Sequence, residues 1–213
     1  MLPPTSLTRL SERGTSDRVT LDALLDDVMV GTLSTVAEGM PWSVPLFIAR
    51  DGDRIVLHGS TGGGILRHLV EGAPVTLTVF ALDAIVVAHT AFDSSANYRS
   101  AVLRGTVTRL EGQEAEDALH VVTERLIPGR TAEVRASTRR EYAATVVLAL
   151  PIEDGMWILK ARSGPAGEPD EPTDAWAGIV SLRTVADTPS ADEWVDPKTL
   201  VPASVEGLRD RYQ

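Results

Sequence analysis

The chain has 213 residues, of which 43% are hydrophobic and 23% are charged, and these proportions are typical of a globular protein rather than of a disordered one. Thirty acidic residues against twenty basic ones give a formal charge of −10, which argues against nucleic acid and anionic membranes as partners. The absence of cysteine excludes disulfides, thiolate catalysis and thiolate-bound metals.

The first part of the chain predicts a short helix followed by antiparallel strands. Residues 22–30 carry apolar side chains at helical spacing, with Thr20 as the expected cap. Three alternating segments separated by turn residues then predict strands at 31–36, 42–49 and 55–58. This part of the chain is expected to be a meander of hairpins.

A glycine-rich segment, residues 59–64, lies between a strand and a short apolar helix. Backbone N–H groups at such a strand-to-helix turn face outward and bind anions. Arg67 lies one turn into the helix, where its guanidinium can reach back to a phosphate. The segment has neither the Gly-Lys-Ser/Thr of a nucleotide P-loop nor a Gly-x-Gly-x-x-Gly. It therefore predicts a phosphate-binding turn, with an ordinary glycine turn as the alternative.

The second part of the chain predicts more strands, one long helix and a tail. The predicted strands are 74–80, 85–89, 101–110, 145–151 and 157–161, and the predicted amphipathic helix is 114–126. Beyond this region the chain is rich in Pro, Asp and Ser. We expect a main domain at residues 1–165 and an irregular extension at 166–213 that packs on it, with Trp176 and Trp194 as anchors.

Several short runs, taken in order, resemble the pyridoxamine 5′-phosphate oxidase-like family of FMN-binding split β-barrels, in the branch that includes nitroimidazole reductases. The runs are Leu57 to Gly64, Asn97 to Gly105, Leu126 to Arg130, Lys160 to Pro165 and Trp176 to Gly178. The resemblance implies a mainly β fold with flanking helices. It also implies a homodimer in which each flavin site draws residues from both chains.

The resemblance further implies a set of residues that bind the cofactor. They are Gly59, Ser60, Thr61, Ile65 and Arg67 on the phosphate side, Ser43, Val44 and Pro45 beside the isoalloxazine ring, and Tyr98, Arg99 and Ser100 at the ring's edge or from the partner chain. Members that oxidise pyridoxamine phosphate have basic residues where this chain has Ser43, Ile48 and Ile65. The vitamin-oxidase reaction is therefore not implied.

His58, at the end of its strand, is implied to lie near the flavin and to be the catalytic residue. An imidazole there supplies a proton to a reduced substrate. The alternative is a half-buried histidine that bonds to a backbone carbonyl. Four scattered histidines without a carboxylate at ligand spacing predict no metal site.

The predicted function is that of an FMN-dependent oxidoreductase acting on a small organic molecule. The alternatives are a flavin- or haem-binding carrier or sensor without turnover, a deazaflavin-dependent reductase, and a structural dimer without a cofactor. No apolar run approaches the ~20 residues of a membrane helix, and the first residues do not resemble a signal peptide. We therefore expect a soluble cytoplasmic protein.

Overall fold

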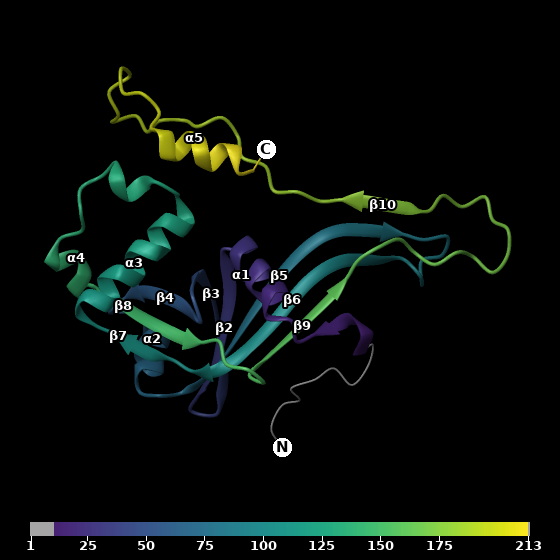
Figure 1. Cartoon of the computed structure of the whole chain (residues 1–213), viewed down its shortest axis with the longest axis horizontal. Coiled ribbons are helices and arrows are strands. Elements are labelled where there is room, and N and C mark those ends of the chain that lie inside the picture. The colour runs from purple at the N-terminus through teal and green to yellow at the C-terminus, as the bar shows by residue number, and fades with distance from the viewer. Residues whose placement is uncertain (1–10, 213) are drawn as a thin grey trace.

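The computed structural model describes residues 11–212 and has a large antiparallel sheet with helices packed against it (Figure 1). Its strands are β1 (Gly14–Thr15), β2 (Val30–Ala37), β3 (Met40–Asp51), β4 (Arg54–Ser60), β5 (Pro74–Val87), β6 (Ser95–Thr106), β7 (Thr108–Leu110), β8 (Thr145–Pro151), β9 (Trp157–Arg162) and β10 (Gly178–Ser181). Its helices are α1 (Arg18–Asp27), α2 (Gly64–Val70), α3 (Gly112–Leu126), α4 (Arg139–Ala143) and α5 (Ala203–Asp210), with 3₁₀ turns at Ser11–Arg13 and Arg130–Ala132. The strand order is β1-β9-β6-β5-β2-β3-β4-β8-β7, and β10 pairs with the end of β5. The predicted mainly β fold with flanking helices is confirmed.

Strand β3 takes part in two ladders, and this divides the barrel. Its residues 40–47 pair with β2, whereas residues 48–51 pair with β4. The last pair between β3 and β4 joins Ile48 to Leu57, and β4 then continues to Ser60 paired with β8. The two strands part beyond Leu57, and the predicted split β-barrel is confirmed.

The main core fills one side of the sheet and is closed by two helices. Helix α1 contributes Leu21, Leu24 and Leu25, and α2 contributes Leu66 and Leu69, all of them buried. Each buried leucine stabilises the fold by about 1.5–3 kcal/mol. Packing of their apolar faces therefore holds these short helices in place more than helix propensity does.

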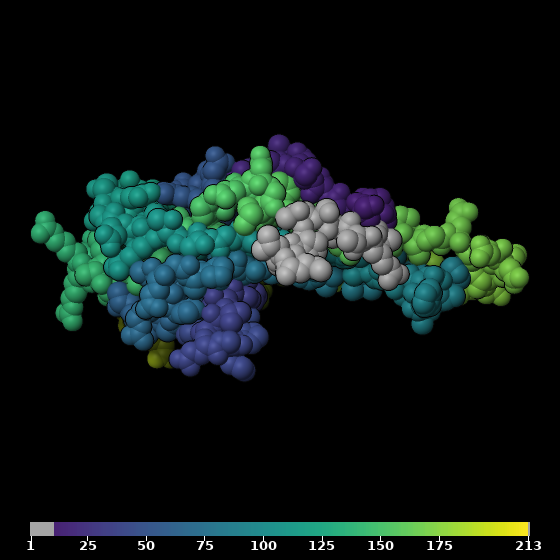
Figure 2. Space-filling view, turned by 90° about the horizontal axis from the view of Figure 1, so that it is seen from below, coloured from purple at the N-terminus to yellow at the C-terminus, as the bar shows by residue number. Residues whose placement is uncertain are grey.

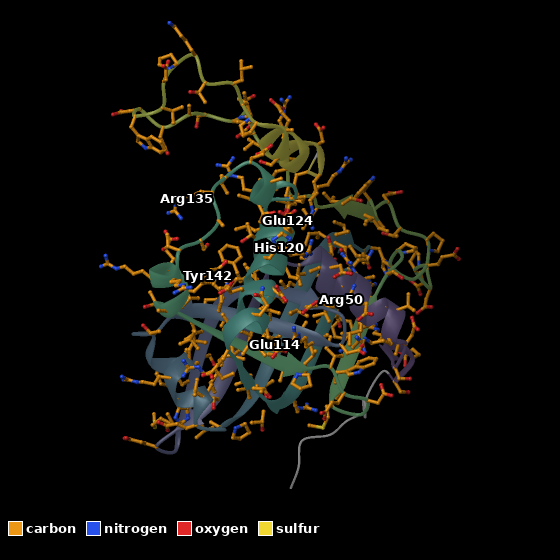
Figure 3. The ribbon with its side chains drawn as sticks, turned by 60° about the vertical axis from the view of Figure 1, so that its left-hand side comes forward. Arg50, Glu114, His120, Glu124, Arg135 and Tyr142 are labelled. Atoms are coloured by element: carbon orange, nitrogen blue, oxygen red, sulfur yellow. The ribbon has the colours of Figure 1, made fainter. Side chains whose placement is uncertain are left out.

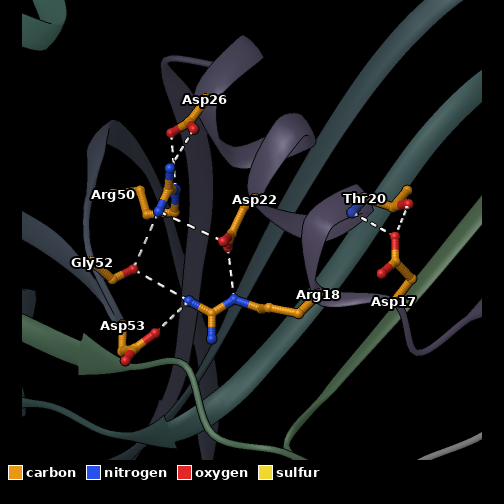
Figure 4. Close-up of polar contacts among 8 residues, drawn as sticks. All are labelled: Asp17, Arg18, Thr20, Asp22, Asp26, Arg50, Gly52 and Asp53. Atoms are coloured by element: carbon orange, nitrogen blue, oxygen red, sulfur yellow. Dashed lines mark hydrogen bonds and ion pairs between the residues drawn. The ribbon is translucent and has the colours of Figure 1, made fainter.

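Ion pairs fasten α1 to the hairpin between β3 and β4 (Figure 4). Arg18 bonds to Asp22 at 2.7 Å and to Asp53 at 2.8 Å. Arg50 of β3 donates two N–H groups to Asp26 at 2.9 and 2.5 Å. The helix is thus held by leucines on its inner face and by arginines at its edge.

A second, smaller core lies between α3 and the side of β4 and β8 that faces away from the main core. Ala118 and Val122 of α3 are buried there against small apolar residues of the strands. The structure confirms the predicted helix at 114–126, which begins at Gly112. Even α3 is too short and too polar to cross a membrane, and the same holds for every other helix of residues 11–212.

On the face of the large sheet that points away from the main core, α3 covers β4, β8 and the end of β3, whereas no helix packs on the part formed by β2, the first part of β3 and β5 within the described residues. Side chains alternate along each strand, so every second residue of β2, β3 and β5 points to this open face. Five of these residues are large, apolar and between 41 and 59% exposed: Val30, Val36, Phe47, Phe80 and Leu82. An apolar face of this kind commonly marks a binding surface.

Strands β5 and β6 extend beyond the barrel as a long arm, and β10 lies along it (Figure 1). Figure 2 shows this arm, in teal, and the green segment before β10 projecting from the body of the molecule. Strand β10 pairs with residues 84–87 of β5, and Leu182 N donates to Asp83 O at 2.9 Å. Backbone pairing therefore fixes the start of the C-terminal extension to the arm.

The helix predicted at 22–30 runs from Arg18 to Asp27, and the strand predicted at 101–110 is divided between β6 and β7. Two further predictions about local structure are wrong. Helix α1 is capped by Asp17 and not by Thr20, because the Asp17 carboxylate accepts from Thr20 N at 2.9 Å. The strands predicted at 74–80 and 85–89 form one strand, β5, in which a bulge accommodates Asp83. In both cases one acidic residue has a local role that hydrophobic periodicity does not reveal.

The prediction that the C-terminal extension is irregular is also wrong in part, because β10 and α5 lie within it. Trp176 and Trp194, the predicted anchors, are 66% and 83% exposed. The extension is held by backbone pairing on β5 and by Ser204, whose N and Oγ donate to the Glu133 carboxylate at 3.0 and 2.5 Å. These contacts depend on segments distant in sequence, so the Pro- and Asp-rich composition does not predict them.

Candidate functional site

The glycine-rich turn after β4 retains some of the expected donors for an anion. Thr61 N donates to the carbonyl that precedes β8 at 3.0 Å, and the N–H groups of Gly62 and Gly63 donate to Ser60 at 3.2 and 2.8 Å. These three donors are used within the protein. The N–H groups of the first turn of α2 have no helical partner. Arg67 is exposed and its side chain makes no hydrogen bond or ion pair among the described residues, so these groups can serve a phosphate.

Two predicted residues of this segment have a packing role. A Cβ on Gly59 would lie 2.5 Å from Leu66 Cδ1, so glycine allows α2 to approach β4 closely. The Ile65 side chain is 6% exposed and belongs to the main core. Gly59 and Ile65 therefore offer a ligand only their backbone atoms.

The predicted ring-facing strand lies beside this turn. Ser43 and Pro45 are exposed on the open sheet face, whereas Val44 packs against the main core. The preceding residue, Trp42, meets the turn directly, since a Cβ on Gly64 would lie 3.0 Å from its ring. The structure brings these two predicted segments to the same end of the barrel.

Tyr98 and Ser100 lie on the same open face, toward its other end. Strand register places Tyr98 six residues further along the sheet than Ser43 and three strands away. At about 3.3 Å per residue and 4.8 Å per strand, the two residues are roughly 20–25 Å apart. Within one chain, the residues predicted at the ring's edge therefore do not meet the phosphate turn.

The side chain of Arg99 forms ion pairs with two aspartates. Its guanidinium bonds to Asp83 at 2.6 and 3.0 Å and to Asp27 at 2.7 Å. The bonds to Asp83, followed by those to Asp27, raise its pKa above the ordinary value. Arg99 thus ties β6 to β5 and α1, and its charge is already neutralised.

His58 lies in the split, where β4 has parted from β3. It is half-buried, neither imidazole nitrogen has a hydrogen bond within residues 11–212, and Nδ1 is fully buried. Burial lowers the pKa of His58, so the imidazole is neutral at pH 7. The alternative interpretation of His58 requires a hydrogen bond from its imidazole to a backbone carbonyl. No such bond is present among the described residues. A neutral imidazole without a partner is suited to ligating a metal or accepting a proton.

His58 lines a pocket of about 320 Å³ between the split and α3. The other lining residues are Met29, Phe47, Ile48, Val122, Thr123, Arg125 and Leu126. Arg125 Nε and Nη2 are buried and have no partner among the described residues. Burial, followed by the nearby charge of Arg211, lowers the pKa of Arg125. The two buried nitrogens without a partner are hydrogen-bond donors that the pocket offers to an anionic ligand.

The sequence reasoning missed Arg125. It lies three residues after Val122, on the side of the helix that faces the sheet. A charged residue at a position with apolar helical spacing is a signal that could have identified it. Its burial, however, depends on how α3 packs across the split.

A second cavity, of about 760 Å³, adjoins the first at Met29. One wall is part of the open sheet face, and the opposite wall is formed by residues 182–184 and 211–212 of the C-terminal extension. Arg183 makes no ion pair in the described part of the chain, and Arg211 donates to the carbonyls of Arg125 and Asp26 at 3.2 and 3.4 Å. Two arginines without carboxylate partners, in a protein of charge −10, favour an anionic ligand.

Helix α3 is anchored close to Arg125 by Glu124 (Figure 3). The Glu124 carboxylate accepts from Thr131 Oγ1, from Gly129 N at 2.7 Å and from Thr131 N at 3.0 Å. These bonds, that from the Thr131 hydroxyl first, lower the pKa of Glu124 to about 2. His120 lies one turn earlier and is exposed. Residues 11–212 hold no cluster of three or more His, Asp or Glu side chains arranged to bind a metal ion.

A barrel split between β3 and β4, with an open sheet face and adjoining cavities that favour anions, has the architecture of the flavin-binding split barrels. The model of the pyridoxamine 5′-phosphate oxidase family matches residues 17–156, and the chain belongs to this family. The resemblance inferred from the sequence is thereby confirmed.

Two solved structures are similar to nearly the whole chain. The FAD and haem binding protein from Mycobacterium smegmatis is 44% identical, with 92% of this chain and 97% of that chain covered and a TM-score of 0.90. The flavocytochrome Anf3 from Azotobacter vinelandii is 28% identical, with 95% of each chain covered and a TM-score of 0.87. A candidate 5-nitroimidazole antibiotic resistance protein from Bacteroides thetaiotaomicron is 19% identical over 70% of this chain and 86% of that chain, with a TM-score of 0.59, and shares the fold. None of the curated proteins matches.

Proposed function

We propose that this protein is a redox protein that binds both a flavin and haem and works as a homodimer. The observation that carries the proposal is the 44% identity, over 92% of this chain, to a protein described as binding FAD and haem. Coverage of that extent continues beyond residue 156, where the family match ends, and so includes much of the C-terminal extension. Anf3, described as a flavocytochrome, is similar over the same range.

The two adjoining cavities support a protein that binds large anionic cofactors. Cofactor pockets commonly measure about 300–1,000 Å³, and these measure about 320 and 760 Å³. Flavin phosphates and haem propionates are both anionic, and Arg125, Arg183 and Arg211 lie at the cavities without carboxylate partners. In a protein with excess negative charge, such arginines are consistent with anionic cofactors.

The proposed role of the protein is to hold and orient the cofactors and to exclude water from them. A bound flavin exchanges one or two electrons and a bound haem exchanges one, so together they link a two-electron donor to a one-electron acceptor. We propose oxidoreductase activity on a small molecule. A carrier or sensor without turnover and a deazaflavin-dependent reductase are the competing functions.

The open sheet face supports the homodimer. A second copy would cover the five exposed apolar residues of this face. It would also supply Tyr98 and Ser100 across an interface to the phosphate turn, which they do not reach within one chain. The shared flavin site that the sequence predicts is therefore proposed here on geometric grounds.

The test is to identify the cofactors of the protein expressed with haem and riboflavin supplied to the cells. Mass spectrometry of the released cofactors should find haem and a flavin, and the flavin's mass distinguishes FAD, named for the relative, from FMN, predicted from the sequence. Reduction of both absorbance spectra by NAD(P)H, followed by turnover of an electron acceptor, would support an enzyme rather than a carrier. A folded dimer that takes up neither cofactor would refute the proposal.

A further inference from the structure

The pocket at the split has three features, and each suits one part of a haem. Its apolar walls, which include Phe47, Ile48 and Val122, suit the macrocycle. The imidazole of His58, with no hydrogen bond in the described chain and a buried Nδ1, suits the iron. The guanidinium of Arg125, with two buried nitrogens that have no partner among the described residues, suits a propionate.

On the basis of the function proposed above, we infer that this pocket is the haem site, with His58 as an axial ligand of the iron and Arg125 paired with a propionate. The pocket and the larger cavity share Met29 as a lining residue, and the proposal places the remainder of the macrocycle past Met29, in the larger cavity. Two further arginines line the larger cavity and are available to bind anionic groups.

The other three histidines are placed less well for this role. His68 Nε2 is bonded to Val36 O at 3.1 Å, and His89 lies 3.6 Å from Asp93 on the projecting arm. His120 is exposed on α3 (Figure 3). None of the three lines either cavity.

Arg125 is expected to distinguish the haem-loaded from the haem-free protein. Without an anion, two buried nitrogens of Arg125 have no hydrogen-bond partner among the described residues, and the neighbouring Arg211 adds a repulsion that Asp26 and Asp27 offset only in part. A carboxylate bound to Arg125 would remove both costs and add charge-assisted hydrogen bonds. The same residue should therefore destabilise the haem-free protein and strengthen haem binding.

The first experiment compares ferric haem bound to the wild-type protein and to His58→Ala by absorption and electron paramagnetic resonance spectra. We expect His58→Ala to lose the imidazole-ligated spectrum and to bind haem at least roughly tenfold more weakly. Added imidazole should restore the spectrum, which a merely structural role of His58 would not allow. His68→Ala and His120→Ala are the matched controls, and both should keep the wild-type spectrum.

The second experiment uses Arg125→Met, which removes the charge and keeps a long apolar side chain. Haem affinity should fall about ten- to a hundredfold, while the haem-free protein should become more resistant to urea. A loss of haem affinity together with a gain in stability would show that Arg125 serves to bind the anionic ligand and not to stabilise the fold.

Different results would refute the proposed haem binding and the assignment of its site. If the wild-type protein binds no haem, the proposed function and this assignment are both wrong. If the wild type binds haem, and His58→Ala and Arg125→Met bind it with unchanged spectrum and affinity, haem binding stands and the site assigned here is wrong.

Discussion

At the scale of single residues, Arg67 and Arg99 illustrate how neighbouring charges decide a role. The sequence predicts cofactor contacts for both. The structure places Arg99 between two aspartates, whereas Arg67 is exposed on α2 without a carboxylate partner in the described chain. An arginine that is not neutralised, next to a glycine and hydroxyl turn, is the group at this end of the barrel best suited to a phosphate.

We predict that Arg67→Ala weakens the binding of FMN or FAD about ten- to a hundredfold, because a charge-assisted hydrogen bond contributes on the order of 1.5–3 kcal/mol. Flavin titrations followed by fluorescence quenching measure the effect. Riboflavin lacks the phosphate, so its affinity should hardly change.

Lys198→Ala provides a control for that prediction, since it removes the same charge at an exposed position of the C-terminal extension, between β10 and α5. It should leave all three flavin affinities unchanged. Equal losses for riboflavin and FMN in Arg67→Ala would mean that the arginine supports the fold of the turn and does not bind the phosphate.

At the scale of elements, α1 depends on both its leucines and its ion pairs (Figure 4). The helix has only ten residues, which is too short to be stable alone in water. Its leucines close the main core, and Arg50 reaches from β3 to Asp26 with two hydrogen bonds. Helix and hairpin are therefore expected to form cooperatively.

We predict a coupling free energy of about 1 kcal/mol between Arg50 and Asp26, near the upper end for partly exposed pairs, because the geometry is bidentate. Urea unfolding of Arg50→Ala, Asp26→Ala and the double variant measures it. The coupling should decrease at high salt. The pair formed by Arg135 and Glu141 (Figure 3) is also bidentate but more exposed, and it should show a smaller coupling.

At the scale of the whole molecule, the open sheet face leaves the barrel incomplete. Its apolar residues lie on three adjacent strands, and the register places Val30 of β2 beside Phe47 of β3. Helices α1 and α2 cover the opposite side of the sheet, whereas the C-terminal extension and α3 lie only along the margins of this one, and its apolar residues stay exposed. A second copy of the chain is the proposed cover.

We predict that light scattering at micromolar concentration gives about twice the chain mass of 22.8 kDa. Val36→Asp should shift the protein to the monomer, because it places a charge in an apolar interface at a residue that lines neither cavity. Val19→Asp, at a 75% exposed position on the outer side of α1, is the control and should remain a dimer. A wild-type monomer that binds flavin with full affinity would contradict the shared site.

Local patterns in the chain were sufficient for much of this fold. The alternation of β2 and β3, the glycine turn and the apolar face of α3 each depend on residues close in sequence, and the structure confirms the elements that they predict. The bulge at Asp83 and the docking of β10 and α5 depend on distant partners. The hydrophobic periodicity of a segment does not reveal partners that are distant in sequence. The elements that depend on such partners are the ones that the prediction missed.

The candidate site divides in the same way. The sequence by itself determined the family, the split barrel and the positions of the glycine-rich turn and of His58, because those features rest on short runs of residues in a fixed order. Only the tertiary structure decided that His58 faces a pocket with Arg125, that Arg99 is neutralised and that the C-terminal extension forms a cavity wall. The reason is physical: whether a charge or an imidazole is available to a ligand depends on its burial and on its partners, and both are fixed by contacts between segments far apart in the chain.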